Sequence, residues 1–303
     1  MSEYPKNLAE LEAMFNTDEQ CLAYLTKLRW PNGFVCPRCK HTESWEVNTN
    51  KYKCKGCGYQ ISVTSGTIFQ GTHKSLVIWF RAIWYITSQK NGTSALNLQR
   101  ILGLGSYRTA WTMLHKLRRA MVRPNRDKLS GIVEVDEAYI GGPEEDGKRG
   151  RGTQNKVLTA VAVEINDNKV GRIRLSAIES ASSESLHPFI EETIEKGSTI
   201  VSDGWLGYKG LQDKGYSHQV LLKKDSEDDN ILPHVHTVVS LLKRWILGTL
   251  QGSCSADHMP YYFDEFCFRF NRRASKSRGL LFYRLLENAV ELNPVTYSDL
   301  INR

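Results

Sequence analysis

Residues 131–142 read GIVEVDEAYIGG, where the hydrophobic period changes from the helical spacing upstream to an extended one, with glycines at both ends. This pattern predicts a β-strand that carries a carboxylate, Asp136, in its middle. A carboxylate inside a strand is costly to desolvate unless it is paired or binds a metal ion. The stretch therefore predicts both the first strand of a sheet and a functional acidic residue.

The segments downstream of this strand complete an α/β pattern. They read as two strands (156–165 and 171–179), a helix (182–197), a buried strand (198–204), a short helix (205–215), a strand (216–224) and a helix that begins near residue 232. Three strands, helix, strand, helix, strand, helix is the order of a ribonuclease H-like domain. We therefore expect an α/β fold with a mixed sheet covered by helices.

A second carboxylate, Asp203, ends the predicted strand STIVSD. If this strand lies beside the first, Asp203 and Asp136 converge and repel each other, and a divalent cation would relieve the repulsion. His236 follows Asp203 by 33 positions, at the start of the next helix. Lys243 shares its helical face, because seven residues amount to a difference of only about 20° around the axis. These positions predict a divalent-metal site formed by Asp136, Asp203 and His236.

Each residue of this expected site has an ordinary alternative. Asp136 can be a buried ion-pair partner, Asp203 a helix N-cap, and His236 a surface residue with His234 as its rival. Other carboxylates compete for the third position, namely Asp225, Glu227, Asp228 and Asp229 in an acidic run that reads as a solvated loop, and Glu265. Strand alternation also puts Glu134 on the face of Asp136, which leaves it an auxiliary role.

Four cysteines form two C-x2-C pairs separated by fourteen residues, in CPRCKHTESWEVNTNKYKCKGC. Cys36, Cys39, Cys54 and Cys57 have the spacing of a tetrahedral structural zinc site. The segment has few apolar residues, so metal binding would supply most of its stability. A redox-active pair is the alternative, but the strand and helix pattern that accompanies such pairs is missing. We therefore expect a zinc ribbon at residues 31–70.

Three helix-like segments follow the cysteines, at residues 75–89, 93–103 and 106–123. The third carries an apolar stripe at helical spacing, with basic residues off the stripe. This arrangement fits a helix-turn-helix whose last helix enters a DNA groove, with a helical linker as the alternative. Basic residues expected to contact DNA here and elsewhere are Arg108, Lys116, Arg118, Arg119, Lys148, Arg149, Arg151, Lys243, Arg244, Arg272 and Arg273.

The overall composition agrees with a nucleic-acid partner. The chain has 303 residues, and 40 Lys and Arg against 33 Asp and Glu give a formal charge of +7, which favours a polyanion. The amino-terminal residues lack the pattern of a secretory signal, and the longest apolar run is too short to span a membrane. We therefore expect a cytoplasmic, nucleoid-associated protein without a membrane partner.

The catalytic residues also carry a family resemblance. Asp136, Asp203, His236 and Lys243 resemble the Asp-Asp-Glu pattern of ribonuclease H-like transposases, with histidine in place of glutamate. The segments SLLKRWILGT (240–249) and YYFDEFCFRFNRR (261–273) resemble the zinc-ribbon insertion-sequence transposases of the fifteen-ninety-five group. The resemblance covers nearly the whole chain. It divides the chain into an amino-terminal helical segment (1–30), the zinc ribbon (31–70), the helix-turn-helix-like segment (71–126), a catalytic domain (127–291) and a tail (292–303).

The resemblance implies a DNA transposase that cuts the ends of a mobile element and joins the freed 3′ hydroxyls to target DNA. It implies that Asp136, Asp203 and His236 hold Mg²⁺ or Mn²⁺, and that Lys243 approaches the DNA. A neutral imidazole suits Mn²⁺ better than Mg²⁺, so we expect Mn²⁺ to support more activity. Double-stranded DNA and further copies of the chain are the expected partners. The rival functions are an inert DNA-binding regulator and a structure-specific nuclease.

Overall fold

The structure is a computed structural model that describes residues 3–48, 50–123, 126–141, 156–225, 230–252 and 254–301. The chain forms two compact units: Met1–Arg123 with Ser275–Arg303 make up the first, and Pro124–Ala274 make up the second. Among the described residues, no helix has the length and apolar character needed to cross a bilayer.

The first unit combines helices with a small antiparallel sheet of order β1-β2-β3. Its elements are α1 (Leu8–Met14), α2 (Asp18–Arg29), β1 (Ser44–Asn48), β2 (Lys51–Cys54), β3 (Gln60–Ser62), α3 (Leu76–Ser88), α4 (Ala95–Ile101), α5 (Tyr107–Ala120), α9 (Arg278–Glu291) and α10 (Tyr297–Ile301). Polar side chains fix where the helices begin: Thr17 forms a capping box with Gln20, and Ser75 and Ser94 cap α3 and α4.

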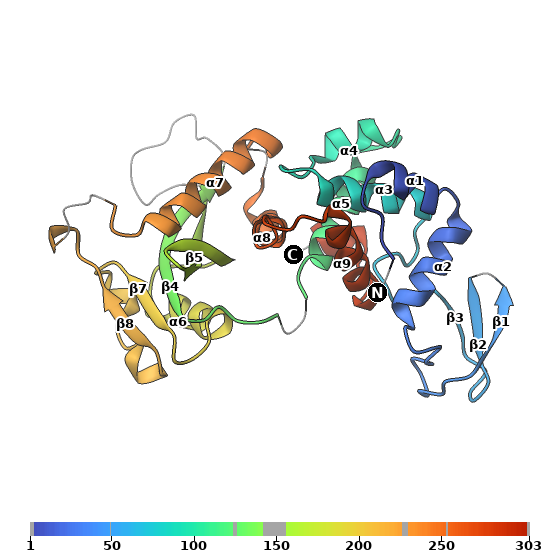
Figure 1. Ribbon diagram of the computed structural model, residues 1–303, viewed down its shortest axis with the longest axis horizontal. Helices are drawn as coiled ribbons and strands as arrows, with labels where there is room; N and C mark the ends of the chain where they lie inside the picture. The colour runs from blue at the N-terminus through green and yellow to red at the C-terminus, as the bar shows by residue number, and fades with distance from the viewer. Residues whose placement is uncertain are drawn as a thin grey trace. The chain divides into compact units, whose positions relative to one another are not determined.

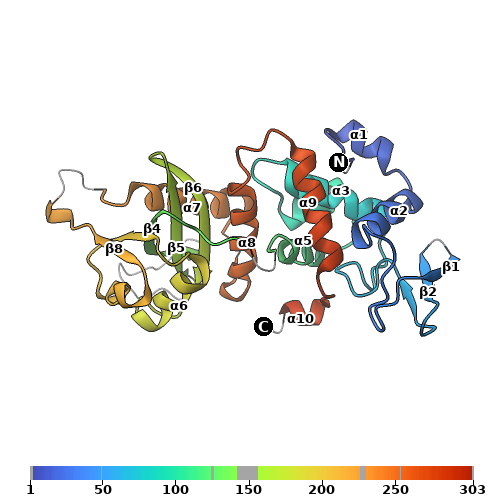
Figure 2. The ribbon, with the colours of Figure 1, turned by 60° about the horizontal axis from the view of Figure 1, so that its bottom comes forward.

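The helix α9 comes from the end of the chain and completes the core of this first unit. It packs against α2, α3 and α5 (Figure 2). Phe282 of α9 is fully buried, and its ring centroid lies 5.7 Å from that of Phe80 and 6.0 Å from that of Phe15. The family resemblance placed α9 in the catalytic domain (127–291), whereas the apolar face of this helix is covered by the amino-terminal helices.

The second unit is built on a five-stranded sheet of order β6-β5-β4-β7-β8. Its elements are β4 (Ile132–Gly141), β5 (Lys156–Asn166), β6 (Lys169–Ala177), α6 (Ser183–Thr193), β7 (Thr199–Ser202), β8 (Ser217–Val220), α7 (Pro233–Leu250), α8 (Met259–Phe270) and the short 3-10 turns η1 (Leu206–Tyr208), η2 (Gln212–Lys214), η3 (Lys223–Asp225) and η4 (Ala256–His258). Strands β6, β5 and β4 pair antiparallel, while β7 and β8 run parallel to β4. This arrangement confirms the predicted ribonuclease H-like fold.

Helices cover both faces of the five-stranded sheet, with α7 and α6 on opposite sides (Figure 1). Strand alternation sends Val161 and Val163 of β5 toward the core that contains α7 and α8. Ala160 and Ala162 of the same strand pack with α6 in the second core. Because Asp136 in β4 pairs with Val161, its side chain points to the α7 face of the sheet.

Candidate metal centres

The four cysteines lie in two knuckles with the same backbone geometry. In the first, the N–H of Lys40 donates to the carbonyl of Cys36, and in the second the N–H of Gly58 donates to the carbonyl of Cys54. Lys40 and Gly58 both have positive φ, 63° and 71°. Each knuckle therefore turns back sharply and presents two sulfur atoms on the same side.

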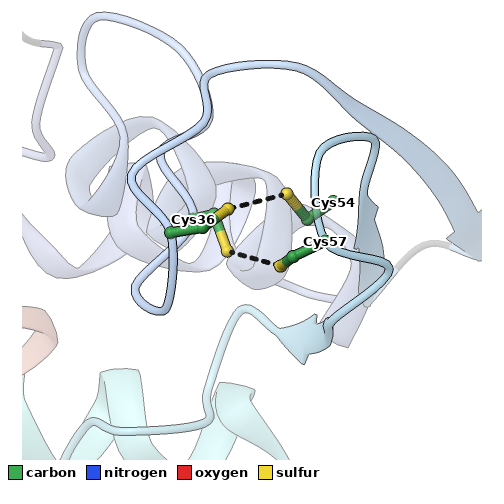
Figure 3. Close-up of side chains that lie close together, drawn as sticks. Cys36, Cys54 and Cys57 are labelled. Carbon is green, nitrogen blue, oxygen red and sulfur yellow. Dashed lines mark hydrogen bonds between the residues drawn. The ribbon is translucent and has the colours of Figure 1, made fainter.

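The sulfur atoms are arranged as a tetrahedral metal would require (Figure 3). The distance from Cys36 Sγ to Cys57 Sγ is 3.8 Å, and that from Cys39 Sγ to Cys54 Sγ is 3.5 Å. All four lie within 4.8 Å of one another. Four thiolates about 2.3 Å from a central zinc would lie about 3.8 Å apart, so the donor set fits structural zinc. The aromatic rings of Trp30, Phe34 and Tyr52 pack beside this ribbon.

The two aspartates of the expected catalytic site lie on adjacent parallel strands. The register pairs Ile132 with Thr199 and Glu134 with Val201. Continued by two residues, the same offset sets Asp136 opposite Asp203, just beyond the end of β7. Opposed residues of neighbouring strands present their side chains to the same face, so both carboxylates are directed to the α7 side of the sheet.

Asp136 is destabilised as an anion by its surroundings. Burial raises its pKa, and the charge of Asp203 raises it further, against a hydrogen bond from the N–H of Glu137 and the proximity of His236. A cation bound between two such carboxylates would offset both effects. Asp203 also accepts a hydrogen bond from the N–H of Trp205 at 2.9 Å, and this bond fixes the carboxylate at the strand end. Asp203 is not the N-cap of the next helix, because the N-cap of η1 is Trp205.

His236 approaches the same place from the first turn of α7. Its Nε2 atom lies 3.3 Å from Oδ2 of Asp136, while its Nδ1 atom contacts the side-chain oxygen of Asn230. The imidazole is 46% exposed, so solvent or a substrate reaches it. Lys243 and Arg244 are also exposed on this helix, whereas Val238 and Leu242 pack into the core. His236 and Asp136 thus lie together on the α7 face of the sheet, and the strand register sets Asp203 opposite Asp136.

The competing ligands lie elsewhere or outside the described residues. Glu265 is fully buried in α8, with its Oε1 atom 3.3 Å from Nε of Arg269. The side chain of Asp225 and residues 226–229 are not among the described parts of the chain. Within the described parts, the four cysteines form the one group of three or more potential ligands whose donor atoms all lie within 4.8 Å of one another.

Two contacts beside Asp136 were missed or only partly anticipated from the sequence. Glu134 bonds to the start of α7, through His234 and the N–H of Val235. On the other side of the strand, the hydroxyl of Tyr208 donates to Oε2 of Glu137 at 2.5 Å. Burial and the charge of Glu137 hold the pKa of Tyr208 well above its usual value, so it remains a donor. Alternation signalled Glu134, but no local pattern pointed to Tyr208.

The expected DNA-contact residues of α5 are largely occupied within the protein. Arg118 is 2% exposed, so its guanidinium is not available to phosphate. The Lys116 ammonium donates to the carbonyl of Ile68, and the Arg108 guanidinium lies 3.7 Å from the ring centroid of Tyr297. Only part of Arg119 reaches the surface. The apolar stripe of α5 is surrounded by other helices, and Arg118 is buried with it, whereas Arg108 stays exposed.

The remaining expected contacts fall into two groups. Arg272 donates to the carbonyl of Phe268, at the end of the helix that precedes it. Arg273 donates to the carbonyls of Val170 and Gly171, so it holds the segment after α8 against β6. The others, Lys148, Arg149 and Arg151, lie outside the described residues.

Two family models match the chain, one over each set of candidate ligands. Residues 128–271 match the ISXO2-like transposase domain, and residues 16–60 match the transposase zinc-ribbon domain. A protein of Halobacterium salinarum, described as an uncharacterized protein in transposable element ISH50, is 26% identical over 275 residues, which are 84% of this chain and 91% of that protein.

Solved structures with weak similarity include two of Mos1 transposase. The paired-end complex with left transposon end covers 71% of this chain and 79% of its own, with 10% identity and a TM-score of 0.26. The pre-cleavage transpososome covers 72% and 79%, with 12% identity and the same TM-score.

Proposed function

We propose that the chain is a DNA transposase of the ISXO2-like family and that Asp136, Asp203 and His236 form its catalytic centre. The proposed reaction is cleavage at the ends of an insertion sequence, followed by joining of the freed 3′ hydroxyls to target DNA. The observation that carries the proposal is the contact of His236 of α7 with Asp136 of β4, with Asp203 opposite Asp136 by the register of β7. The distance of 3.3 Å between His236 Nε2 and Asp136 Oδ2 links the helix to the sheet at this point.

The donor set suits divalent cations. Bound there, the cations would stabilise negative charge on the attacking and leaving oxygens of an in-line displacement at phosphorus. Asp136 and Asp203 offer the hard oxygen ligands that Mg²⁺ and Mn²⁺ share, and His236 offers a nitrogen that Mn²⁺ accepts more readily. The hydrogen bond from Trp205 fixes the Asp203 carboxylate, and the Asn230 side chain fixes the imidazole of His236.

We propose that the exposed face of α7 receives the DNA backbone. Lys243 lies on the same side of the helix as His236, two turns further on, and Arg244 is its exposed neighbour. Cations in this position neutralise phosphates close to the metal site without reading the bases. We expect two or more copies of the chain to assemble on a pair of element ends. A monomer mass for the DNA-bound protein in light scattering would contradict this expectation.

The test is cleavage and joining of a labelled element-end duplex with Mn²⁺ or Mg²⁺. Asp203→Ala and His236→Ala are expected to lose both reactions while retaining zinc and duplex binding. Asp213→Ala, which removes an exposed carboxylate of the same unit, is the control and should retain both. A native protein that binds the duplex without cutting it would be a regulator, and one that cuts without joining would be a nuclease.

A further inference from the structure

A buried carboxylate connects the strand that carries Asp136 to the helix that carries His236. Glu134 lies two residues before Asp136 in β4, and it is 4% exposed. Its Oε2 atom accepts a hydrogen bond from the backbone N–H of Val235 at 2.9 Å, and its Oε1 atom lies 2.6 Å from Nδ1 of His234. Both of these partners belong to the first turn of α7.

The first turn of α7 has no cap of its own. Its N-cap residue is Leu232, which has no side-chain acceptor, and the helix then begins with Pro233. The leading N–H groups of a helix need acceptors, and an anion near them is favoured by the helix dipole. Glu134 supplies both from the neighbouring strand. His234 extends the connection, because its Nε2 atom lies 3.3 Å from the carbonyl oxygen of Asn168.

We propose that Glu134 is a positioning residue that holds the start of α7 against β4 and so keeps His236 beside Asp136. The proposal rests on the proposed function, in which His236 and Asp136 bind the same cation. Val235 and His236 are adjacent, so a displacement of the Val235 N–H also moves the imidazole that stands 3.3 Å from Asp136. Groups that orient metal ligands in this way commonly change metal affinity by about 10-fold to 100-fold when removed.

The sheet provides a matched control in Glu164 of β5. It is also 4% exposed, and it is also fully engaged, with Oε1 2.7 Å from Nη2 of Arg172 and a hydrogen bond from the N–H of Ser130. Glu164 pairs with Val133, whose side chain belongs to the α6 core, so it lies on the opposite face from α7. Glu164→Ala therefore removes a buried carboxylate from the same sheet and leaves the contacts of Glu134 with α7 in place.

The experiment uses the full zinc-loaded chain as Glu134→Ala, Glu134→Gln and Glu164→Ala. Hydrogen exchange is measured over residues 232–242, and Mn²⁺ binding is measured from the electron paramagnetic resonance signal of the free ion. Glu134→Ala should speed exchange in the first turn of α7 and weaken Mn²⁺ binding about 10-fold or more. Glu134→Gln should recover part of both, because its amide oxygen still accepts from Val235. Glu164→Ala should change neither.

Two results would overturn the proposal. Unchanged exchange in Glu134→Ala would mean that Glu134 does not hold α7, and faster exchange with native Mn²⁺ affinity would mean that it holds the helix without positioning His236. The variant Asp136→Ala distinguishes a failure of this proposal from a failure of the proposed function. If native protein and Asp136→Ala bind Mn²⁺ equally, the catalytic metal site itself fails, and the exchange comparison alone then decides whether Glu134 holds α7.

Discussion

At the residue scale, the acidic residues around Asp136 have different tasks because alternate side chains point to opposite faces of the strand. Glu134 and Asp136 face α7, whereas Glu137 faces away and accepts from Tyr208. Tyr208 lies in the turn that follows Asp203, so this hydrogen bond joins β4 to the segment after β7. The segment EVDE (134–137) therefore holds three acidic side chains with different contacts. Glu134 contacts the start of α7, Asp136 contacts His236, and Glu137 contacts Tyr208.

The Tyr208 hydroxyl should contribute measurably to stability. Tyr208→Phe removes a hydrogen bond to a partly buried carboxylate, and we expect a loss of about 1.5–3 kcal/mol in the free energy of unfolding. Tyr216→Phe is the control, because its hydroxyl donates to the neutral carbonyl of Ile194 at 3.2 Å and should cost about 0.5–1.5 kcal/mol. Both losses in the free energy of unfolding are measured by urea denaturation, from the unfolding transition of the second unit. Equal losses would contradict the special role of Glu137.

Among the secondary-structure elements, α5 shows what hydrophobic periodicity can and cannot predict. The spacing of apolar residues predicted its buried stripe, and Leu114 and Leu117 of that stripe are fully buried. It did not predict that Arg118 of α5 would be buried as well. Periodicity identifies the stripe that must be covered, but the width of the covered surface depends on helices from distant parts of the chain.

The exposed cations of α7 should therefore contribute to DNA binding where Arg118 does not. We expect Lys243→Ala to weaken duplex binding and to reduce the slope of log K against log salt by about 0.9, the value for one lost phosphate contact. Arg244→Ala should act similarly. The control is Lys196→Ala, an exposed cation that follows α6, the helix on the opposite face of the sheet from α7 (Figure 1). A slope that is unchanged in Lys243→Ala and Arg244→Ala would exclude α7 from the DNA interface.

The zinc ribbon should depend on its metal. Replacing one cysteine of each knuckle, as in Cys36→Ala with Cys54→Ala, should abolish zinc binding and speed hydrogen exchange over β1, β2 and β3, because the ribbon has little core besides the metal site. Cys254→Ala, in the second unit, should retain one zinc per chain. Elemental analysis and exchange together test this, and normal exchange in the zinc-free double variant would contradict it.

At the scale of the whole molecule, the chain leaves the first unit after Arg123 and returns to it at Ser275. The strands and helices of the second unit come from one continuous stretch of the chain, so their order along the sequence predicted a ribonuclease H-like fold. The destination of α9 could not be predicted in the same way. The apolar face of α9 could pack against either unit as far as the sequence shows. The contacts of Phe282 with Phe15 and Phe80 show that it completes the core of the first unit.

This division predicts where a core substitution will be felt. Phe282→Ala should cost about 3–5 kcal/mol and should speed exchange in α2 and α3, leaving β5 and β6 protected. Phe263→Ala, from a side chain that is 1% exposed in the core of α7 and α8, should have the opposite distribution. Exchange that rises equally in both units for either variant would contradict the division.

Much of the proposed catalytic centre follows from the sequence for a physical reason. Asp136 and Asp203 stand out because a strand does not ordinarily contain an acidic residue without a partner. Their closeness required the parallel pairing of β4 with β7, which the order of elements suggested. The contacts of Glu134 and Tyr208 could not be specified, since each joins segments that are about 70 to 100 residues apart.

In the proposed centre, His236 binds a divalent cation together with Asp136 and Asp203. The most direct measurement is the ratio of strand-cleavage rates in Mn²⁺ and Mg²⁺ for the native protein and for His236→Glu, which restores a carboxylate. If the imidazole is a ligand, Mn²⁺ should give the faster rate in the native protein, and the ratio should fall toward Mg²⁺ in His236→Glu. The same ratio in both proteins would contradict direct binding by His236.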